Sequence, residues 1–168
     1  MPEVRLRPTR PDDLDFVTRL ERHPGNRDFI GPWSDAEHLP AIAGDGGREH
    51  WLIEADGMRA GYLIAYDCSE HDAGFYVKRL LIADKQRGHG SAALRQFDDR
   101  VLAMAGVSCV WLIVRNWNLR AQRVYVRLGY QRFEPTGDEA ARYDAGAEAP
   151  LEGCFRMRLR DLSGRLRT

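Results

Sequence analysis

Apolar and polar residues alternate along this chain with two different periods, which predict a succession of strands and helices. Over 4–8, apolar and charged residues take turns, as in a half-buried strand. Over 14–20, apolar residues recur every third position and predict a helix with one apolar face. A helical spacing also runs through 90–106 and 118–128, and each of these stretches closes at a glycine, which commonly follows a helix.

Runs of apolar residues predict the remaining strands. The runs 50–55 and 58–68 are separated by Asp56-Gly57, a strong hairpin signal. The stretch 135–152 has low hydrophobicity and is expected to form a loop with a mobile tip. The resulting order, β-α-α-β-β-β-α-β-α-β-β, describes a mixed α/β sheet, with its later strands predicted at 75–83, 107–114, 130–133 and 154–159.

Composition narrows the class of protein. The 168 residues are 43% hydrophobic and 30% charged, which suits one compact domain over 1–168. Lysine plus arginine and aspartate plus glutamate number 25 each, so the chain lacks the basic character of a nucleic-acid-binding protein. Arginines gather at 115–132 and 156–167, and such runs are usually exposed surface.

Cysteine spacing and hydropathy indicate the compartment. The three cysteines are far apart and form no CxxC pair, so buried thiols in a reducing compartment are expected. No apolar run approaches the length of a membrane span, and the first residues carry no apolar signal core. We therefore expect a cytoplasmic protein with no membrane partner. No histidine and carboxylate cluster has metal-ligand spacing, so no metal is expected.

The segment LLIADKQRGHGSAAL, residues 80–94, carries the first chemical signal. Gly88 and Gly90 flank His89 between a predicted strand and a predicted helix. Glycines let the backbone approach a ligand closely, and the start of a helix offers N–H groups and a positive dipole end. The segment therefore predicts a phosphate cradle.

Two familiar phosphate loops fit this segment poorly. A Walker A loop needs Gly-Lys-Ser/Thr, which is absent. The dinucleotide fingerprint is met by Gly88-x-Gly90-x-x-Ala93, but these glycines do not follow the strand directly. Arg115 and Asn116 stand at the end of the next strand, where that motif needs an acid.

Two motifs together resemble the GNAT superfamily of acyl-CoA-dependent N-acyltransferases. Residues 87–92, Arg-Gly-His-Gly-Ser-Ala, are similar to its pyrophosphate loop, Arg/Gln-x-x-Gly-x-Gly/Ala. Asn118 and Tyr125 lie at the spacing of its Asn-x-x-Ala-x-x-x-Tyr helix, and Arg-Leu-Gly-Tyr at 127–130 resembles the ending of that motif. The resemblance is close over 75–134 and concerns layout alone in the first 70 residues.

The resemblance implies a fold and a cofactor site. The fold would be α/β, with a mixed, mostly antiparallel sheet of six to seven strands, about four helices and splayed central strands. Acetyl-CoA would be the co-substrate. Its pantetheine would pair with the backbone of a free strand edge, and its pyrophosphate would lie on the glycine loop, where Gly90 and Ala92 are small enough to admit it. The expected cofactor-binding residues are Leu80, Leu81, Ile82, Arg87, Gly88, His89, Gly90, Ser91, Ala92, Asn118 and Tyr125.

Roles follow for several of these side chains. Tyr125 would stabilise or protonate the departing CoA sulfur as the tetrahedral intermediate collapses. Asn118 would bind pantetheine or cap its own helix. His89 would point outward along the phosphates, as a phosphate contact or bystander. The ribose 3′-phosphate would be bound by one of three arginines, Arg120, Arg123 or Arg127.

The chain departs from the family where a general base is often found. Many members carry an acid on the fourth strand, but Tyr76, Lys78 and Arg79 stand there instead. The acceptor would then lose its proton through a water chain, arrive neutral, or use a nearby group such as Glu54, Asp67, Glu70, His71 or Asp72.

We expect transfer of an acetyl group to a small primary amine or peptide amine in a ternary complex, by a monomer or homodimer. Phe29 and Trp33 would form an aromatic floor for the acceptor, or a lid packed on the core. Acids of the 135–152 loop would form a rim suited to a cationic amine. The alternatives are another acyl donor, an oxygen acceptor, or a catalytically idle acyl-CoA-binding module.

Overall fold

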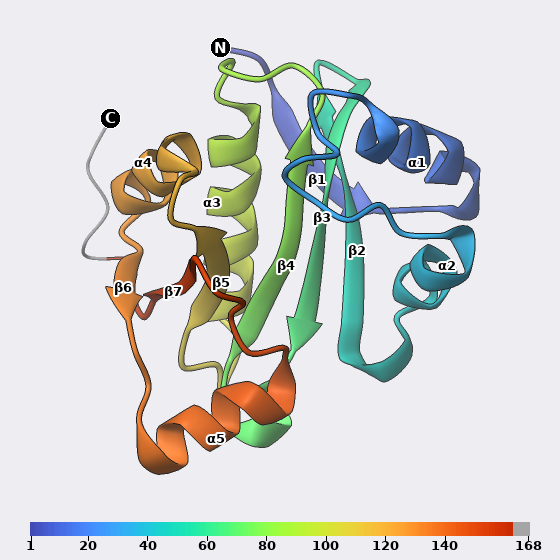
Figure 1. Cartoon of the computed structure of the whole chain (residues 1–168). Helices are drawn as coiled ribbons and strands as arrows, with labels where there is room; N and C mark the ends of the chain where they lie inside the picture. The colour runs from blue at the N-terminus through green and yellow to red at the C-terminus, as the bar shows by residue number, and fades with distance from the viewer. Residues whose placement is uncertain (163–168) are drawn as a thin grey trace. The chain divides into compact units, whose positions relative to one another are not determined.

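The computed structural model describes residues 1–162 (Figure 1). Three short 3-10 turns accompany the helices, at Pro11–Asp13, Asp45–Gly47 and Ser69–His71. In chain order the main elements are β1 (Val4–Pro8), α1 (Leu14–Arg22), α2 (Asp35–Ala43), β2 (Arg48–Ala55), β3 (Met58–Asp67), β4 (Phe75–Ile82), α3 (His89–Leu102), β5 (Val110–Arg115), α4 (Leu119–Arg127), β6 (Gln131–Phe133), α5 (Gly137–Gly146) and β7 (Cys154–Leu159).

The strands hydrogen-bond in the order β1-β2-β3-β4-β5-β7-β6. β1 pairs antiparallel with β2, and β7 pairs antiparallel with both β5 and β6. β4 pairs with β5 in parallel. This arrangement confirms the predicted mixed, mostly antiparallel sheet.

The chain forms two compact units. Among the described residues, the first comprises Met1–Ala65 and Arg79–Gln96, and the second comprises Tyr66–Lys78 and 97–162. β3, β4 and α3 each contribute residues to both units. The single domain over 1–168 stays a prediction.

The first unit is built around β1, β2 and the start of α3. β1 pairs with β2 along its whole length, from Val4 opposite Ala55 to Pro8 opposite Trp51. The Gln96 side chain donates to the Val4 carbonyl at 2.6 Å and fixes α3 beside this edge strand. α1 buries the apolar face that its spacing predicts, and a capping box at Ser34 starts α2.

Aromatic residues form the core of the second unit. Tyr76 of β4 stacks on Trp111 of β5 with ring centroids 4.4 Å apart, and Tyr143 meets Trp111 edge to face at 5.0 Å. Cys68 and Cys109 are buried, unoxidised members of the same cluster. The aromatic residues of β4 and β5 therefore lie in a packed core.

Tyr143 belongs to α5, where the sequence predicts a loop. That prediction is wrong: Gly137–Gly146 is helical (Figure 1). One face of α5 carries a buried tyrosine, while Asp144 pairs with Arg156 and Glu139 pairs with Arg158, both on β7. The helix thus forms through contacts with a distant strand and shows little apolar periodicity of its own.

Gly74, at the start of β4, offers a test of this packing. Its φ is +60°, and a Cβ there would lie 2.1 Å from the Cys109 carbonyl oxygen. Gly46 has a similar φ of +63°, with no atom within 4 Å of its Cβ position. We expect Gly74→Ala to lower the free energy of unfolding by roughly 3 kcal/mol or more, and Gly46→Ala by about 1 kcal/mol. Urea unfolding measures both, and equal losses would contradict the clash.

Candidate functional site

The loop after β4 leads directly into α3, as the glycine motif predicts. Gly88 has a φ of +78° with open space around its Cβ position, so glycine serves the backbone conformation there. The Ala92 amide already donates to the Gly88 carbonyl at 3.0 Å, which closes the first helical turn. The amides ahead of that turn have no partner within the helix. Arg87, Gly88, Ser91 and Ala92 therefore lie together at a helix start suited to an anion.

Gly90 is required by packing in addition to any ligand. A Cβ at this position would lie 3.2 Å from Ile82 Cγ1 and 4.0 Å from Leu80 Cδ2. Both side chains point from β4 toward the start of α3. Gly90 therefore allows the helix to approach the strand closely, a reason for glycine that the sequence motif alone does not reveal.

His89 differs from its predicted orientation. It is the first residue of α3, and it is 7% exposed rather than directed outward. Its Nδ1 is buried without a hydrogen-bond partner among the described residues. With Asp84 and Arg87, it lines a hollow of about 760 Å³ that also reaches the β2–β3 hairpin. The outward orientation is therefore wrong, whereas the contact of His89 with the phosphates stays a prediction.

Pairing between β4 and β5 ends part-way along β4. The parallel register joins Phe75, Tyr76 and Val77 to β5, and it does not extend further in the described chain. β4 itself continues to Ile82. The segment Leu80–Ile82 thus belongs to the stretch of β4 without a β5 register, as the predicted pantetheine-binding edge requires.

Asn118 and Tyr125 lie on α4, in the second unit. Asn118 is the N-cap, and its Oδ1 accepts a hydrogen bond from the Ala121 amide at 3.2 Å. Tyr125 lies two turns later, with its ring 5.9 Å from Tyr130. Burial of its hydroxyl raises the pKa of Tyr125 to about 12, so the phenol keeps its proton near neutrality. Asn118 therefore caps its own helix, which is one of the two roles predicted for it.

The predicted proton acceptors are already engaged. Glu54 pairs with Arg7 at 2.7 Å, and Asp72 pairs with Arg142 at 2.9 Å. Glu70 and His71 lie 3.2 Å apart, and the Asp67 carboxylate accepts the Ser69 amide. None of these groups is an unoccupied base.

A buried carboxylate that sequence analysis missed is Glu21, at the end of α1. Its Oε1 accepts from the Tyr62 hydroxyl and from Arg79 Nη1 at 3.0 Å. Its Oε2 accepts the Trp33 amide at 2.8 Å and lies 3.2 Å from His38 Nε2. Glu21 stands four residues after buried Val17, on the apolar face of the helix. An acid in that stripe is the signal that could have revealed it.

The Glu21 cluster continues through two histidines. His38 Nδ1 lies 3.2 Å from His50 Nε2, and His50 Nδ1 lies 2.8 Å from the Thr9 hydroxyl. Burial lowers the pKa of His50 to about 3, with His38 adding to the effect. Burial opposes the charge on Glu21, but the nearby His38 ring and the hydrogen bonds from Tyr62 and the Trp33 amide outweigh it and lower the pKa of Glu21. Glu21 is therefore ionised and His50 neutral.

The predicted acceptor residues are differently placed. Trp33 lies over Arg79, with 4.7 Å between the guanidinium carbon and the ring centroid, and 5.3 Å from the His38 ring. Phe29 is 43% exposed, and Lys85 Nζ lies 5.2 Å from its ring. Trp33 is thus fixed to β4, whereas Phe29 stays near solvent.

Three acids of the predicted rim form ion pairs within the second unit. Asp144 pairs with Arg156, Glu139 with Arg158, and Glu148 with Lys78. Both arginines come from the run at 156–167, of which 163–167 lies outside the described residues.

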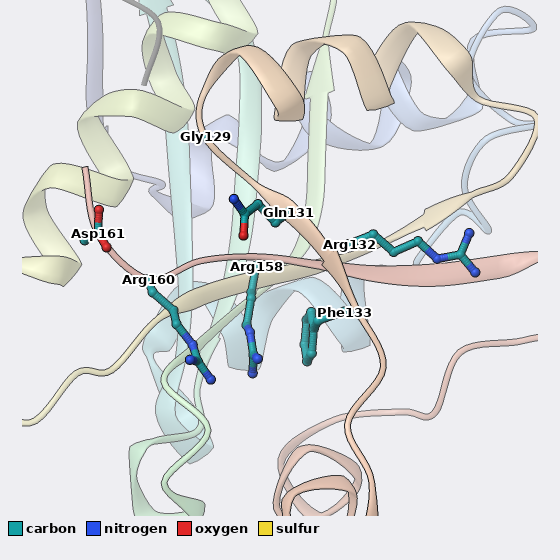
Figure 2. Close-up of a pocket in the computed structure, with 7 residues that line it drawn as sticks. All are labelled: Gly129, Gln131, Arg132, Phe133, Arg158, Arg160 and Asp161. Carbon is teal, nitrogen blue, oxygen red and sulfur yellow. The ribbon is translucent and has the colours of Figure 1, made fainter. Parts of the chain in front are cut away.

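A second hollow in the second unit, of about 230 Å³, lies beside β6 and β7 (Figure 2). Figure 2 shows Arg158 and Phe133 extending side by side, and the guanidinium carbon lies 4.2 Å from the Phe133 ring centroid. None of the predicted site residues lines it. Within residues 1–162, no helix has the length and apolar character needed to cross a membrane, and no cluster of three or more histidine, cysteine or acidic side chains is arranged to hold a metal.

Comparison with known proteins decides the family. The family model described as Acetyltransferase (GNAT) family matches residues 16–130. The chain belongs to the GNAT acetyltransferase family. A search among curated proteins finds no match.

Solved structures support the same fold for this GNAT chain. Spermidine N-acetyltransferase from Vibrio cholerae, in complex with CoA and spermine, has a TM-score of 0.69 at 16% identity, covering 93% of this chain and 94% of its own. Arabidopsis thaliana Naa50 in complex with the bisubstrate analogue CoA-Ac-MVNAL has a TM-score of 0.65 at 18% identity, and the match covers 93% of this chain and 97% of that one. Ribosomal-protein-S18-alanine N-acetyltransferase from Escherichia coli has a TM-score of 0.66 at 21% identity, and the match covers 94% of this chain and 93% of that one.

The neutral, buried His50 predicts a pH-dependent stability. Its pKa is about 3 in the folded chain and 6.5 in the unfolded one, so the unfolded chain takes up the proton first as pH falls. Between about pH 7.5 and about pH 5, the wild type should lose about 2 kcal/mol more unfolding free energy than His50→Gln. Urea unfolding across this range measures the difference. Parallel pH curves would show that His50 is protonated in the folded state.

Proposed function

We propose that this chain transfers an acetyl group from acetyl-CoA to a primary amine by direct attack in a ternary complex. The observation that carries the proposal is the pair of motifs on folded elements of a GNAT chain. The glycine loop opens α3, and Tyr125 follows the Asn118 cap on α4. The family and the similar structures support acetyl-CoA as the co-substrate.

The loop and β4 are assigned to the cofactor. Backbone amides from Arg87 to Ser91 would bind the pyrophosphate at the positive end of α3, whereas the Ala92 amide already donates to the Gly88 carbonyl. The backbone of Leu80–Ile82 would pair with the pantetheine amides, because the β5 register stops before it. A site of this kind recognises the cofactor through its main chain, so the side chains there can vary.

The chemistry proposed is a nucleophilic substitution at the acetyl carbonyl. The amine nitrogen forms the new C–N bond, and collapse of the tetrahedral intermediate breaks the C–S bond. The Tyr125 hydroxyl is protonated near neutrality, as a tyrosine ordinarily is, and burial raises its pKa further to about 12; it would give its proton to the departing sulfur. The proton released by the amine would leave through water, since the nearby carboxylates are paired.

The acceptor class is proposed as a small amine or a peptide amine. Similar structures are named for both: the Vibrio cholerae structure contains spermine, and the Arabidopsis thaliana structure contains a peptide bisubstrate analogue. The ion pairs of the second unit weaken the case for a strongly cationic acceptor, because Glu139, Asp144 and Glu148 are already paired with basic side chains. Trp33 over Arg79 offers an aromatic surface instead.

An amine panel tests the function. Thiol release from acetyl-CoA is followed with polyamines, aminoglycosides, amino acids and peptide amines, and each product is identified by mass. We expect turnover with at least one class. Tight acetyl-CoA binding without turnover on any amine would support the idle binding module instead, and acetylation of a hydroxyl group would support an oxygen acceptor.

Tyr125→Phe tests the role of the leaving-group acid. It should lower kcat by roughly tenfold or more while the Kd for acetyl-CoA changes little, because the hydroxyl acts mainly in the transition state. Tyr130→Phe, which keeps a neighbouring ring and removes another hydroxyl, is the matched control. A kcat within about twofold of wild type for Tyr125→Phe would remove Tyr125 from the chemistry.

A further inference from the structure

Glu21 joins five separate segments of the first unit at one carboxylate. It lies on α1 and accepts hydrogen bonds from β3 through Tyr62, from β4 through Arg79 and from the α1–α2 loop through Trp33. His38 of α2 completes the set at 3.2 Å. Glu21, His38 and Tyr62 have no exposed surface. Taking a carboxylate out of water is costly, so this arrangement compensates the charge from every side.

The same geometry excludes Glu21 as the base that takes the acceptor proton. Oε1 already accepts two hydrogen bonds and Oε2 accepts one, and Glu21 has no exposed surface from which an amine could approach it. These bonds also lower the pKa of Glu21, which weakens it as a base. Its effect on a reaction must therefore pass through the residues that it holds.

Two of those residues lie where the acceptor is expected. Arg79 directly precedes the Leu80–Ile82 segment, and one residue of strand advances by roughly 3.3 Å. The Trp33 ring lies on the Arg79 guanidinium, and its backbone amide is bound to Glu21. Two contacts thus hold Trp33 beside the proposed cofactor edge. Its amide donates to Glu21 directly, and its ring lies on Arg79, which Glu21 also binds.

We propose that Glu21 is a positioning residue for the acceptor amine, acting through Trp33 and Arg79. The inference rests on the proposed function and deepens it. Glu21 holds the Trp33 ring as one wall of the acceptor site, and its charge offsets that of Arg79. The wall is then close to neutral, so an amine can approach without repulsion from an uncompensated guanidinium.

Glu21→Gln tests the inference. The amide keeps one accepting oxygen but turns an NH2 group toward either the Tyr62 and Arg79 donors or the Trp33 and His38 donors. We expect the KM for the acceptor to rise by roughly tenfold, with the Kd for acetyl-CoA within about twofold of wild type. Hydrogen exchange at the Trp33 amide, followed by mass spectrometry, should quicken by roughly tenfold or more.

Asp13→Asn is the matched control. Asp13 is also a buried carboxylate with several partners, but it lies at the opposite end of α1, bound to Arg7 and Arg59. Asp13→Asn should lower the free energy of unfolding about as much as Glu21→Gln does, and it should leave the acceptor KM and the hydrogen exchange of the Trp33 amide unchanged. If Glu21→Gln does not fold, Arg79→Lys provides the second variant: it keeps the charge, loses the flat surface under Trp33, and should also raise the acceptor KM.

The outcomes separate the two proposals. An active wild type with an unchanged acceptor KM in folded Glu21→Gln, or in Arg79→Lys when that variant is used instead, overturns the positioning role alone. A KM rise of equal size in Asp13→Asn also overturns it, because the effect would then follow stability. A wild type that binds acetyl-CoA and acetylates no amine overturns the proposed function and, with it, this inference.

Discussion

Backbone hydrogen bonding between β4 and β5 stops at Val77, while β4 continues to Ile82, and the proposed chemistry depends on this interruption. A strand within a sheet normally satisfies its amides and carbonyls on both sides, and a buried group left without a partner costs about 1–3 kcal/mol. A ligand with its own amides could complete the pairing.

The Glu21 cluster is the second organising feature of the first unit. Burying a carboxylate, a guanidinium and two histidines together gives little net stability compared with an apolar core, because desolvation cancels most of the attraction. Such a cluster instead fixes the positions of its side chains, because each hydrogen bond requires one geometry. Here it fixes Trp33 and Arg79, which lie next to the proposed cofactor-binding edge of β4.

The parts of the fold and site that the sequence predicts are those encoded locally. The glycine loop and the Asn118–Tyr125 spacing lie within single short segments, so their placement at the starts of α3 and α4 is readable from the residues. Glu21 is different, because its partners Trp33, Tyr62 and Arg79 are 12, 41 and 58 residues away. α5 is missed for a related reason: it is held by ion pairs to β7 and one buried tyrosine, not by a periodic apolar face.

Hydrogen exchange along β4 tests whether pantetheine pairs with the backbone of Leu80–Ile82. Amides of Leu80, Leu81 and Ile82 are compared with those of Phe75, Tyr76 and Val77, with and without saturating CoA. If the segment beyond the β5 register binds pantetheine strand-fashion, CoA should slow exchange within Leu80–Ile82 by roughly tenfold or more and leave the paired residues nearly unchanged. Saturating CoA that leaves exchange at Leu80–Ile82 unaltered would contradict the account.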